Sequence, residues 1–441
     1  MRPAILEDGA LAGVRVLDFT WIVAGPQATR ILGALGAEII RVEWPERVDS
    51  MRLGMARPPD VEPSMNSDGF FNNLNANKYG VTLDATDPRG REILQRLIAA
   101  SDVVIENFSA GTFERWGFDY EWFTSIRPDI IYLSCSGFGH SGRYRDYDTW
   151  GPSAQALAGL TFASGLPGHP PAGWGFSYMD QTAGYLGALA VLMALHYRNQ
   201  TGQGQYIDMS QAESGMALTG AAFLDFSVNG RRSRRAGFPP GNRAAWPGVP
   251  YSNAYRGAVA APHNSYPCAG GGMNDWCVIA VSTDEQWQAL VDVMGAPDWA
   301  RDARFATLAG RLRYQDELDA HIADWTSTLD KYAVMERLQA VGVPAGAVQS
   351  SEDRVERDPQ LAARGYYVEH DHPVLGRRRF EGLPIHLSAT PAAVWKAAPT
   401  IGQDTADVLR SVLGMPDDEI EQLTEAGVLW PSSFSRTEVG Q

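Results

Sequence analysis

The sequence predicts an α/β fold in which a mostly parallel sheet carries helices on both faces. Short apolar runs alternate with helix-like segments along the first half of the chain, and several of these runs end in turns of glycine or polar residues. Such alternation is typical of parallel sheets, because each helix returns the chain to the edge where the previous strand began. With 441 residues, of which 44% are hydrophobic and 20% charged, the chain can bury a large core and form two domains.

The N-terminal segment predicts the first βαβ unit. A buried strand is expected over residues 13–19, and Pro26 begins a helix because proline is favoured at the first helical position. The next strand covers residues 38–43. Its last residue, Glu43, stands where a dinucleotide-binding fold places an acid on a ribose, but the turn after the first strand lacks the GxGxxG glycines. Conventional NAD binding is therefore not expected.

Further α/β units follow along the chain. Strands are expected over residues 81–84, 102–106 and 130–134, and Asp87 caps the helix between the first two. The third of these strands ends in the glycine-rich turn 136–139. Because ligands of open α/β sheets bind beyond the carboxyl ends of the strands, we expect the functional site at the turns that follow them.

The composition excludes several classes of function. The net charge of −15 and a pI near 5.0 argue against nucleic acid or an anionic membrane as a partner. No apolar run is long enough to cross a membrane, and residues 1–8 lack the apolar run of a signal peptide, so we expect a cytoplasmic protein. The three cysteines form no CxxC and the eight histidines form no HExxH, so neither a disulfide framework nor a metal site is expected.

An acidic protein that binds a phosphorylated ligand must gather its cations locally. Arg41, Lys78 and Arg115 lie near the predicted strand ends and are candidates for this role. A solvated surface charge explains each of them equally well, as it does most single basic residues.

Asp180 lies where a loop rich in aromatic residues, 173–179, leads into an apolar helix. The segment 185–197 is apolar or glycine almost all round, which predicts a helix that is buried on every face and too short to span a bilayer. An aspartate at this place is most often an N-cap, because its carboxylate accepts orphan backbone N–H groups. An ionised carboxylate in an apolar pocket is also a potential nucleophile, and the local sequence leaves both roles open.

The composition changes in the second half of the chain. Residues 229–272 are rich in Gly, Pro and Arg, and so long a stretch is either a linker or a set of functional loops. Residues 274–348 alternate strand-like and helix-like segments and predict a smaller α+β module. The C-terminal part adds strands around residues 367–370 and 380–387 and a terminal helix over residues 404–413.

Several short motifs follow one another in order along nearly the whole chain. They are residues 13–20 with 24–26, 35–43, 77–78, 102–108, 136–139, 201–205 and 398–405. Together they resemble the class III CoA-transferase family, whose members include formyl-CoA transferases and α-methylacyl-CoA racemases. Each motif alone is a weak signal, whereas their common order and spacing are specific.

The resemblance implies that Asp180 is the nucleophile of a CoA-transferase. The aspartate attacks an acyl-CoA donor to give a mixed anhydride, CoA thiolate converts the anhydride into an aspartyl-CoA thioester, and a carboxylic acid acceptor then takes the CoA. Coenzyme A is thus expected as part of the acyl-CoA substrate, and no metal is expected. The residues expected to contact CoA, by resemblance or by their place near strand ends, are Trp21, Ile22, Val23, Ala24, Arg41, Lys78, Asn107, Phe108 and Arg115.

A second set of residues is expected on the substrate side of the site. The three glycines of this set resemble the small-domain loop that closes over the site in formyl-CoA transferase, although a plain hairpin turn explains them nearly as well. The members of the set are Phe138, Gly139, His140, Trp150, Gly270, Gly271 and Gly272.

The acceptor acid is predicted only in outline. Aromatic residues near the expected site suggest a bulky or aromatic acid, and an arginine is a candidate to hold a second carboxylate. The aromatic residues are Trp21, Trp44, Trp150, Trp174, Phe138 and Phe176, and the arginines are Arg143, Arg145 and Arg243.

The family fold is an interlocked homodimer, which the resemblance implies for this chain, with a heteromer of this chain and a paralogue as the alternative. Residues 1–225 and 350–441 are then expected to form a large Rossmann-like CoA-binding domain. Residues 226–268 are expected to be a linker with loops, and residues 269–349 a small α+β domain.

Two other functions stay open. In racemases of the family a histidine precedes the equivalent aspartate, and Trp150 stands at that position here, so one of the two acid/base groups is missing. His140 lies nearby, and a racemase is therefore the first alternative. A non-catalytic CoA-binding subunit is the second, and the presence of Asp180 argues against it.

Overall fold

The computed structural model describes residues 3–44, 46–54, 56–163, 171, 173–230 and 260–430. The chain divides into two compact units. The first unit contains both ends of the chain and consists of Met1–Ala158, Gly175–Ala217 and Gln360–Gln441. The second unit consists of Gly159–Trp174 and Leu218–Pro359.

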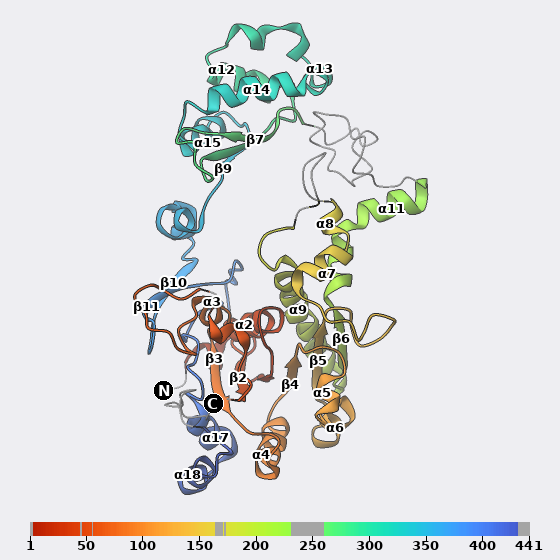
Figure 1. Cartoon of the computed structure of the whole chain (residues 1–441), viewed down its shortest axis with the longest axis vertical. Helices are drawn as coiled ribbons and strands as arrows, with labels where there is room; N and C mark the ends of the chain where they lie inside the picture. The colour runs from red at the N-terminus through yellow and green to blue at the C-terminus, as the bar shows by residue number, and fades with distance from the viewer. Residues whose placement is uncertain are drawn as a thin grey trace. The chain divides into compact units, whose positions relative to one another are not determined.

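The first unit is built on a six-stranded sheet in which every pair of neighbouring strands is parallel (Figure 1). The strand order is β3-β2-β1-β4-β5-β6, the order of a Rossmann-like sheet. The predicted α/β fold with a mostly parallel sheet is thereby confirmed. The strands are β1 (Arg15–Asp18), β2 (Glu38–Glu43), β3 (Lys78–Thr82), β4 (Val103–Glu106), β5 (Ile131–Ser136) and β6 (Tyr206–Ser210).

Strand β3 begins three residues before the predicted strand. Its register pairs Lys78 with Ile39 and Thr82 with Glu43, so it runs beside almost the whole length of β2. Asp84, which was expected to end the strand, instead accepts a hydrogen bond from the Thr86 hydroxyl in the following turn. The sequence did not show that β3 begins at Lys78, because this charged residue is buried through an ion pair and not through apolar packing.

Helices cover both faces of this sheet. Successive strand residues such as Val16 and Leu17 point to opposite faces and join two separate clusters of buried side chains. The helices on one face are α2 (Ala24–Ala34) and α9 (Tyr178–Thr201), and those on the other are α4 (Pro88–Ala99), α6 (Tyr120–Ile126), α17 (Thr405–Leu413) and α18 (Asp417–Glu425).

Helix α9 differs from the prediction in its burial. One face, with Ala188 and Val191, packs on α2 and the sheet, and a Cβ on Gly184 would lie 2.6 Å from the Cβ of Gln27. The opposite face leaves Leu189 and Met193 about half exposed or more, at 50% and 63%. A helix whose residues are apolar on all sides is therefore not necessarily buried on every face within a single chain.

Shorter elements complete the first unit. A two-stranded antiparallel hairpin of β10 (Tyr367–His372) and β11 (Gly376–Glu381) begins its second strand earlier than predicted, because the turn closes at Gly376. The remaining helices are α1 (Ile5–Asp8), α3 (Gly69–Leu74), α5 (Thr112–Arg115), α7 (Gly151–Leu157) and α10 (Gln211–Met216).

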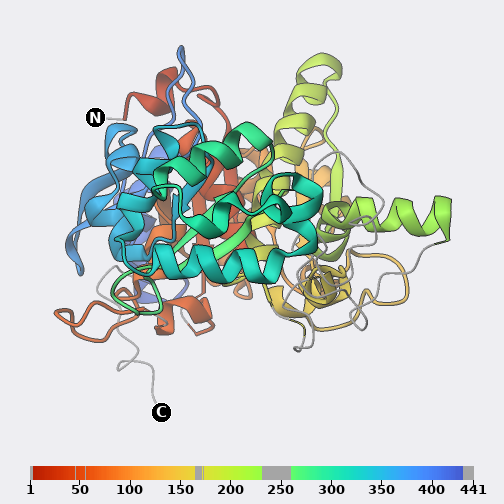
Figure 2. The same ribbon diagram turned by 90° about the horizontal axis from the view of Figure 1, so that it is seen from above.

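The second unit is an α+β module with an antiparallel sheet of order β7-β8-β9. Its strands are β7 (His263–Pro267), β8 (Trp276–Ala280) and β9 (Ala345–Ala347). Its helices α12 and α14 are drawn in teal in Figures 1 and 2. The helices are α8 (Leu160–Ala163), α11 (Gly220–Asn229), α12 (Asp284–Val293), α13 (Leu308–Arg313), α14 (Gln315–Thr326) and α15 (Lys331–Gln339), and α16 (Pro359–Ala363) follows at the boundary between the units.

The segment predicted as a linker, residues 226–268, is not free of regular structure. Its beginning belongs to α11 and its end to β7, while residues 231–259 lie outside the described part of the chain. In β7 the exposed His263 and Ser265 alternate with half-buried Asn264 and buried Tyr266, and this short strand was not distinguishable from a loop by composition.

Charged side chains from β1, β2 and β3 are buried together near the carboxyl end of β1. The Nζ of Lys78 lies 2.9 Å from Asp18, and both side chains are fully buried. Burial alone would raise the pKa of Asp18, but Lys78 and Arg41 outweigh it and hold this pKa below its usual value. Burial also lowers the pKa of Lys78, to about 8, so that the pair is ionised at neutral pH.

We predict that Lys78→Met destabilises the first unit by about 3–5 kcal/mol, because the substitution leaves the Asp18 carboxylate buried without its cation. The thermal unfolding midpoint, followed by circular dichroism, measures the effect. Arg410→Met is the matched control, since Arg410 pairs with Asp417 at the exposed surface and the loss of such a pair costs about 0–1 kcal/mol. An equal shift for both variants would contradict a special role of the buried pair.

Candidate active site

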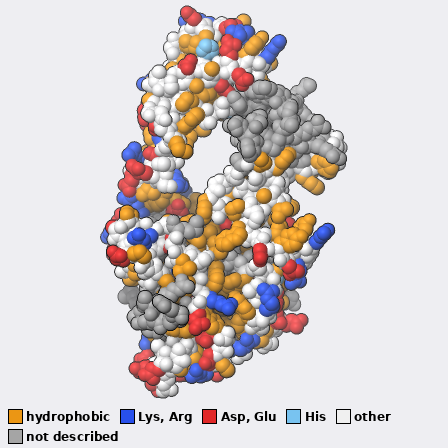
Figure 3. Space-filling view, in the orientation of Figure 1, with side chains coloured by type: hydrophobic (Ala, Val, Ile, Leu, Met, Phe, Trp, Pro, Cys, Tyr) orange, Lys and Arg blue, Asp and Glu red, His pale blue; other side chains and the backbone are white. Residues whose placement is uncertain are grey.

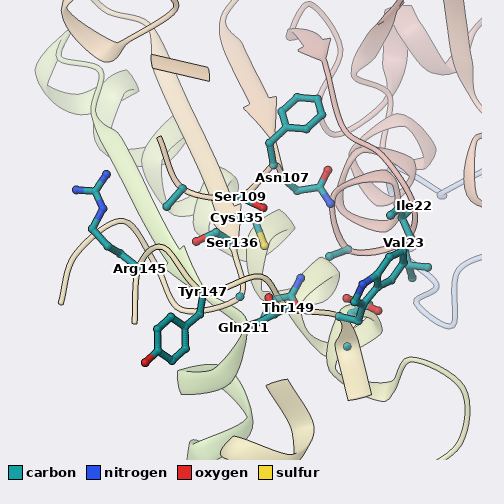
Figure 4. Close-up of a pocket in the computed structure, with 17 residues that line it drawn as sticks. Ile22, Val23, Asn107, Ser109, Cys135, Ser136, Arg145, Tyr147, Thr149 and Gln211 are labelled. Carbon is teal, nitrogen blue, oxygen red and sulfur yellow. The ribbon is translucent and has the colours of Figure 1, made fainter. Parts of the chain in front are cut away.

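A pocket opens at the carboxyl ends of β1, β4 and β5, where the strand order of the sheet changes direction (Figure 4). This is the place at which open α/β sheets bind ligands. All residues of its lining belong to the first unit. They are Ile22, Val23, Ala24, Asn107, Phe108, Ser109, Ala110, Cys135, Ser136, Gly137, Arg145, Tyr147, Thr149, Trp150, Gly151, Asp180 and Gln211.

Asp180 contributes the carboxyl group of the pocket. It lies in the first turn of α9 and is 8% exposed, while Ser177 occupies the N-cap position with a left-handed backbone (φ 51°). Burial raises the pKa of Asp180, and hydrogen bonds with the side chains of Ser177 and Gln211 act in the opposite direction. The carboxyl group is thus mostly buried and held by two side chains, and Asp180 itself is not the N-cap.

Gly151 forms the wall beside this carboxyl group. A Cβ at Gly151 would overlap Oδ2 of Asp180 and come within 2.9 Å of its Cγ. Only glycine leaves room at this point, at the start of α7. The close approach leaves no space for a larger group on that side of the carboxylate.

The loop after β1 forms a second wall and has an unusual backbone. Asn107 holds Trp21 from both sides, because its Oδ1 accepts from the backbone N–H at 2.7 Å and its Nδ2 donates to the carbonyl at 2.9 Å. Ile22 follows with φ 67°, and its N–H donates to Asp49 at 3.1 Å. These contacts fix Ile22, Val23 and the start of α2 at the edge of the pocket.

The structure brings together part of the predicted site. The predicted residues that line the pocket are Ile22, Val23, Ala24, Asn107, Phe108, Trp150 and Asp180, and Arg145 from the candidate arginines joins them. Those that do not belong to its lining are Trp21, Arg41, Lys78, Arg115, Phe138, Gly139, His140, Gly270, Gly271 and Gly272. Of the aromatic residues considered for the acceptor, Trp150 lines the pocket, with its side chain 65% exposed. Arg243 lies outside the described residues.

Arg41 and Lys78, which are predicted to contact CoA, have carboxylate partners within the protein. Both are buried, and Arg41 donates to Asp49 at 2.9 Å and to the carbonyl of Thr20 at 2.6 Å. A buried cation that already has carboxylate partners is poorly suited to a phosphate of a ligand. The contact with CoA stays a prediction, and this burial counts against it.

Arg115 and His140 lie near the pocket but outside its lining. Arg115 is exposed and donates to the Thr112 hydroxyl at 2.7 Å. His140 contacts Ser134 at 2.5 Å and Glu114 at 3.3 Å. Among the described residues that line the pocket, none is a histidine.

A buried carboxyl group lies behind the same strand ends. Glu106 ends β4, and it accepts hydrogen bonds from the Ser134 hydroxyl and from the backbone N–H of Phe108. Burial raises the pKa of Glu106 to about 7, with a smaller contribution from Glu114. The polar cluster therefore supports the turn at Phe108 without offering a free carboxylate to the pocket.

The glycine loop belongs to the second unit. Gly270 and Gly271 have positive φ angles, and a Cβ at Gly270 would overlap the carboxyl group of Asp275. The N–H of Gly272 donates to that carboxyl group at 2.8 Å. Glycine is thus required by the turn itself, as the hairpin alternative expects, and a role over the active site stays a prediction.

Several lining residues were not proposed from the sequence. Cys135 lies next to the end of β5, and Gln211 begins α10 directly after β6. The rule that ligands bind beyond parallel strand ends would have found these positions once the strand ends were known. Tyr147, Thr149 and Gly151 carry no comparable signal, because they lie in an irregular loop or at the start of a short helix.

No helix among residues 3–44, 46–54, 56–163, 171, 173–230 and 260–430 is long and apolar enough to cross a membrane. In the same part of the chain, no group of three or more His, Cys, Asp or Glu side chains is arranged to hold a metal ion.

The fold and the pocket define an α/β protein with a buried carboxyl group at a Rossmann-type binding crevice. Sequence comparison gives the family: the model of CoA-transferase family III matches residues 11–405. The chain belongs to this family and is a class III CoA-transferase, which acts on CoA thioesters.

Curated relatives align over nearly their full length. The formyl-CoA:oxalate CoA-transferase of Rhodopseudomonas palustris is 33% identical over 429 residues, which cover 96% of this chain and 98% of the relative. The succinyl-CoA–D-citramalate CoA-transferase of Chloroflexus aurantiacus is 34% identical over 430 residues, which cover 97% and 98%.

Solved structures share the fold. A CAIB/BAIF family protein from Brucella suis matches with a TM-score of 0.78 at 29% identity, covering 92% of this chain and all of that one. Rv3272 from Mycobacterium tuberculosis matches with a TM-score of 0.72 at 25% identity, covering 90% and 99%.

We predict that Gly151→Ala lowers the rate of CoA transfer by roughly 10²-fold, because a shift of about 1 Å at a reacting group has effects of this size. Steady-state assays with an acyl-CoA donor and an acid acceptor measure the rate. Gly220→Ala is the matched control, since a Cβ at Gly220 meets no atom within 4 Å. Activity of Gly151→Ala equal to that of the control would show that the carboxyl group of Asp180 tolerates displacement.

Proposed function

We propose that the protein moves CoA from an acyl-CoA donor to a carboxylic acid through intermediates on Asp180. The observation that carries this proposal is the Asp180 carboxyl group itself, which is buried in the pocket of a CoA-transferase and held by Ser177 and Gln211. Covalent catalysis by a carboxylate requires a group that is shielded from water and can still ionise, and this setting meets both requirements.

The transfer proceeds in four steps that conserve the bond energy of the thioester. An Asp180 oxygen attacks the donor carbonyl, and CoA thiolate leaves as a mixed anhydride forms. The thiolate then attacks the carboxyl carbon of Asp180, which releases the donor acid and leaves an aspartyl-CoA thioester. The acceptor carboxylate attacks the same carbon to form a second anhydride, and the released thiolate takes the acceptor acyl group from Asp180.

The acceptor that fits best is a small acid with a second carboxylate. The two relatives are named for the acids oxalate and citramalate, and Arg145 lines the pocket beside Tyr147 and Thr149. A guanidinium binds a carboxylate with paired hydrogen bonds. The expected bulky aromatic acceptor is less well supported, because Trp150 alone of the six aromatic residues considered lines the pocket.

The residues that line the pocket also distinguish CoA transfer from the alternative racemase activity. Proton exchange at the α-carbon needs two acid/base groups, and the described lining offers Asp180 with Trp150 in the place where family racemases have histidine. CoA transfer needs the single carboxylate that is present. The arrangement therefore favours transfer over racemisation.

Two copies of the chain are proposed to form the functional unit. In the first unit, α9 exposes Tyr185, Leu189 and Met193, and in the second unit α11 exposes Phe223 and Phe226. Apolar side chains gather over α11 in Figure 3. Exposed apolar side chains like those on each of these helices are typical of surfaces that a partner covers, and an interlocked homodimer is the state that the family resemblance implies.

Size-exclusion chromatography with light scattering tests the homodimer. The wild-type chain is expected to elute at twice the mass of one chain, and Leu189→Asp combined with Met193→Asp is expected to shift it towards the monomer, because charges replace apolar contacts in the interface. Wild-type protein that stays monomeric at micromolar concentration would contradict the proposal.

A panel of acyl-CoA donors and acids tests the function. Wild-type protein is expected to produce a new acyl-CoA from at least one donor with a dicarboxylic acceptor, whereas Asp180→Asn is expected to lose transfer because an amide is not a nucleophile. Since only the ionised form attacks, the rate falls as pH falls through the raised pKa of Asp180, so the acidic limb lies above the usual range for aspartate. Transfer by Asp180→Asn at the wild-type rate would refute the assignment.

A further inference from the structure

Gln211 is a second polar side chain in contact with the reacting carboxyl group. It is the first residue of α10 and directly follows β6, and the pairing of Ser136 with Ser210 places it beside the carboxyl end of β5. Its side chain is buried and lines the pocket (Figure 4). It also hydrogen-bonds the carboxyl group of Asp180. The backbone of α10 is fixed beside the pocket, because the N–H of Ala212 donates to the carbonyl of Gly137 at 3.0 Å.

The Gln211 amide presents its NH₂ group to the Asp180 carboxyl group. Burial raises the pKa of Asp180 and raises that of the Cys135 thiol to about 12, whereas hydrogen bonding with Gln211 lowers both pKa values. A hydrogen bond lowers the pKa of an acid when it is donated to the ionised form, and the amide NH₂ is the only donor of a glutamine side chain.

Building on the proposed transfer mechanism, we propose that Gln211 is a catalytic residue whose amide N–H stabilises the oxyanion formed on the carboxyl group of Asp180. The hydrogen bond marks one carboxyl oxygen as the future carbonyl oxygen and leaves the other oxygen free to attack the acyl-CoA. A hydrogen-bonding group that is already in place before the negative charge develops needs no reorganisation, and such groups stabilise a tetrahedral intermediate strongly.

The role applies to the two steps in which the carbon of Asp180 is the electrophile. When CoA thiolate adds to this carbon, a C–S bond forms and the electron pair of the C=O bond moves onto the oxygen that Gln211 contacts. The pair then returns as the C–O bond to the donor acid breaks, and that acid leaves as a carboxylate. Addition of the acceptor carboxylate follows the same course, with CoA thiolate as the leaving group, so no other reactant is needed.

Rapid-quench mass spectrometry of the Gln211→Leu variant tests the proposal. Formation of the aspartyl-CoA thioester is expected to slow by roughly 10²-fold, the usual effect of losing one oxyanion donor, while the KM for the donor is unchanged. Gln288→Leu is the matched control, since Gln288 is an exposed glutamine of α12 that bonds Asp292. A Gln211→Leu variant that forms the thioester at the wild-type rate would overturn the proposal.

A second variant separates hydrogen-bond donation from a purely structural role. Gln211→Glu keeps the shape of the side chain but can donate only when it is protonated. Its rate relative to wild type is therefore expected to rise as pH falls, whereas the rate of Gln211→Leu stays low at every pH. A Gln211→Glu rate that keeps a constant ratio to wild type across the pH range would overturn the proposal, even if Gln211→Leu folds poorly.

Failure of this inference and failure of the proposed function give different results. If wild-type protein forms no covalent species on Asp180 with any donor, the transfer mechanism is wrong and Gln211 has no such role. If wild-type protein forms the thioester and both Gln211 variants form it equally fast at every pH, the mechanism stands and only the role of Gln211 is refuted.

Discussion

A set of buried ion pairs below the sheet's carboxyl edge holds one wall of the active site in place. Arg41 joins this edge to the loop after β1, because it binds both Asp49 and the carbonyl of Thr20, and Asp49 in turn receives the N–H of Ile22. A charge buried without a partner is very costly, so each member depends on the others. The left-handed backbone at Ile22, and with it the edge of the pocket, is a consequence of this arrangement.

The same network explains why a Rossmann-like strand order does not imply NAD binding here. Glu43 lies at the position of a ribose-binding acid, but it pairs with Arg52 at 2.7 Å and is buried. Gly25 is needed for packing, since a Cβ there would lie 2.9 Å from Oδ1 of Asn107 and overlap Thr20. The fold thus retains the binding crevice at the strand ends, but Glu43 and Gly25 are engaged in contacts within the protein and are not available to bind a dinucleotide.

The sequence predicted the parallel sheet, the approximate position of most of its strands and the place of Asp180, because apolar runs and turn residues report local structure directly. It did not predict that Lys78 and Arg41 are buried, since burial of a cation depends on carboxylates far away in sequence. Gln211 and Gly151 were missed for a related reason: each becomes part of the site only through the packing of α9 against α7 and α10. The exposed face of α9 was wrongly predicted to be buried, because an apolar sequence pattern does not show whether the same chain covers that face of the helix.

If CoA passes through a covalent bond to Asp180, peptide mass spectrometry will detect this bond. The enzyme is mixed with an active acyl-CoA donor and treated with hydroxylamine or borohydride, which convert a thioester or anhydride into a stable product. We expect a modification on the peptide that contains Asp180, and none in Asp180→Asn. A modification of another residue, or CoA transfer without any modified peptide, would contradict this expectation.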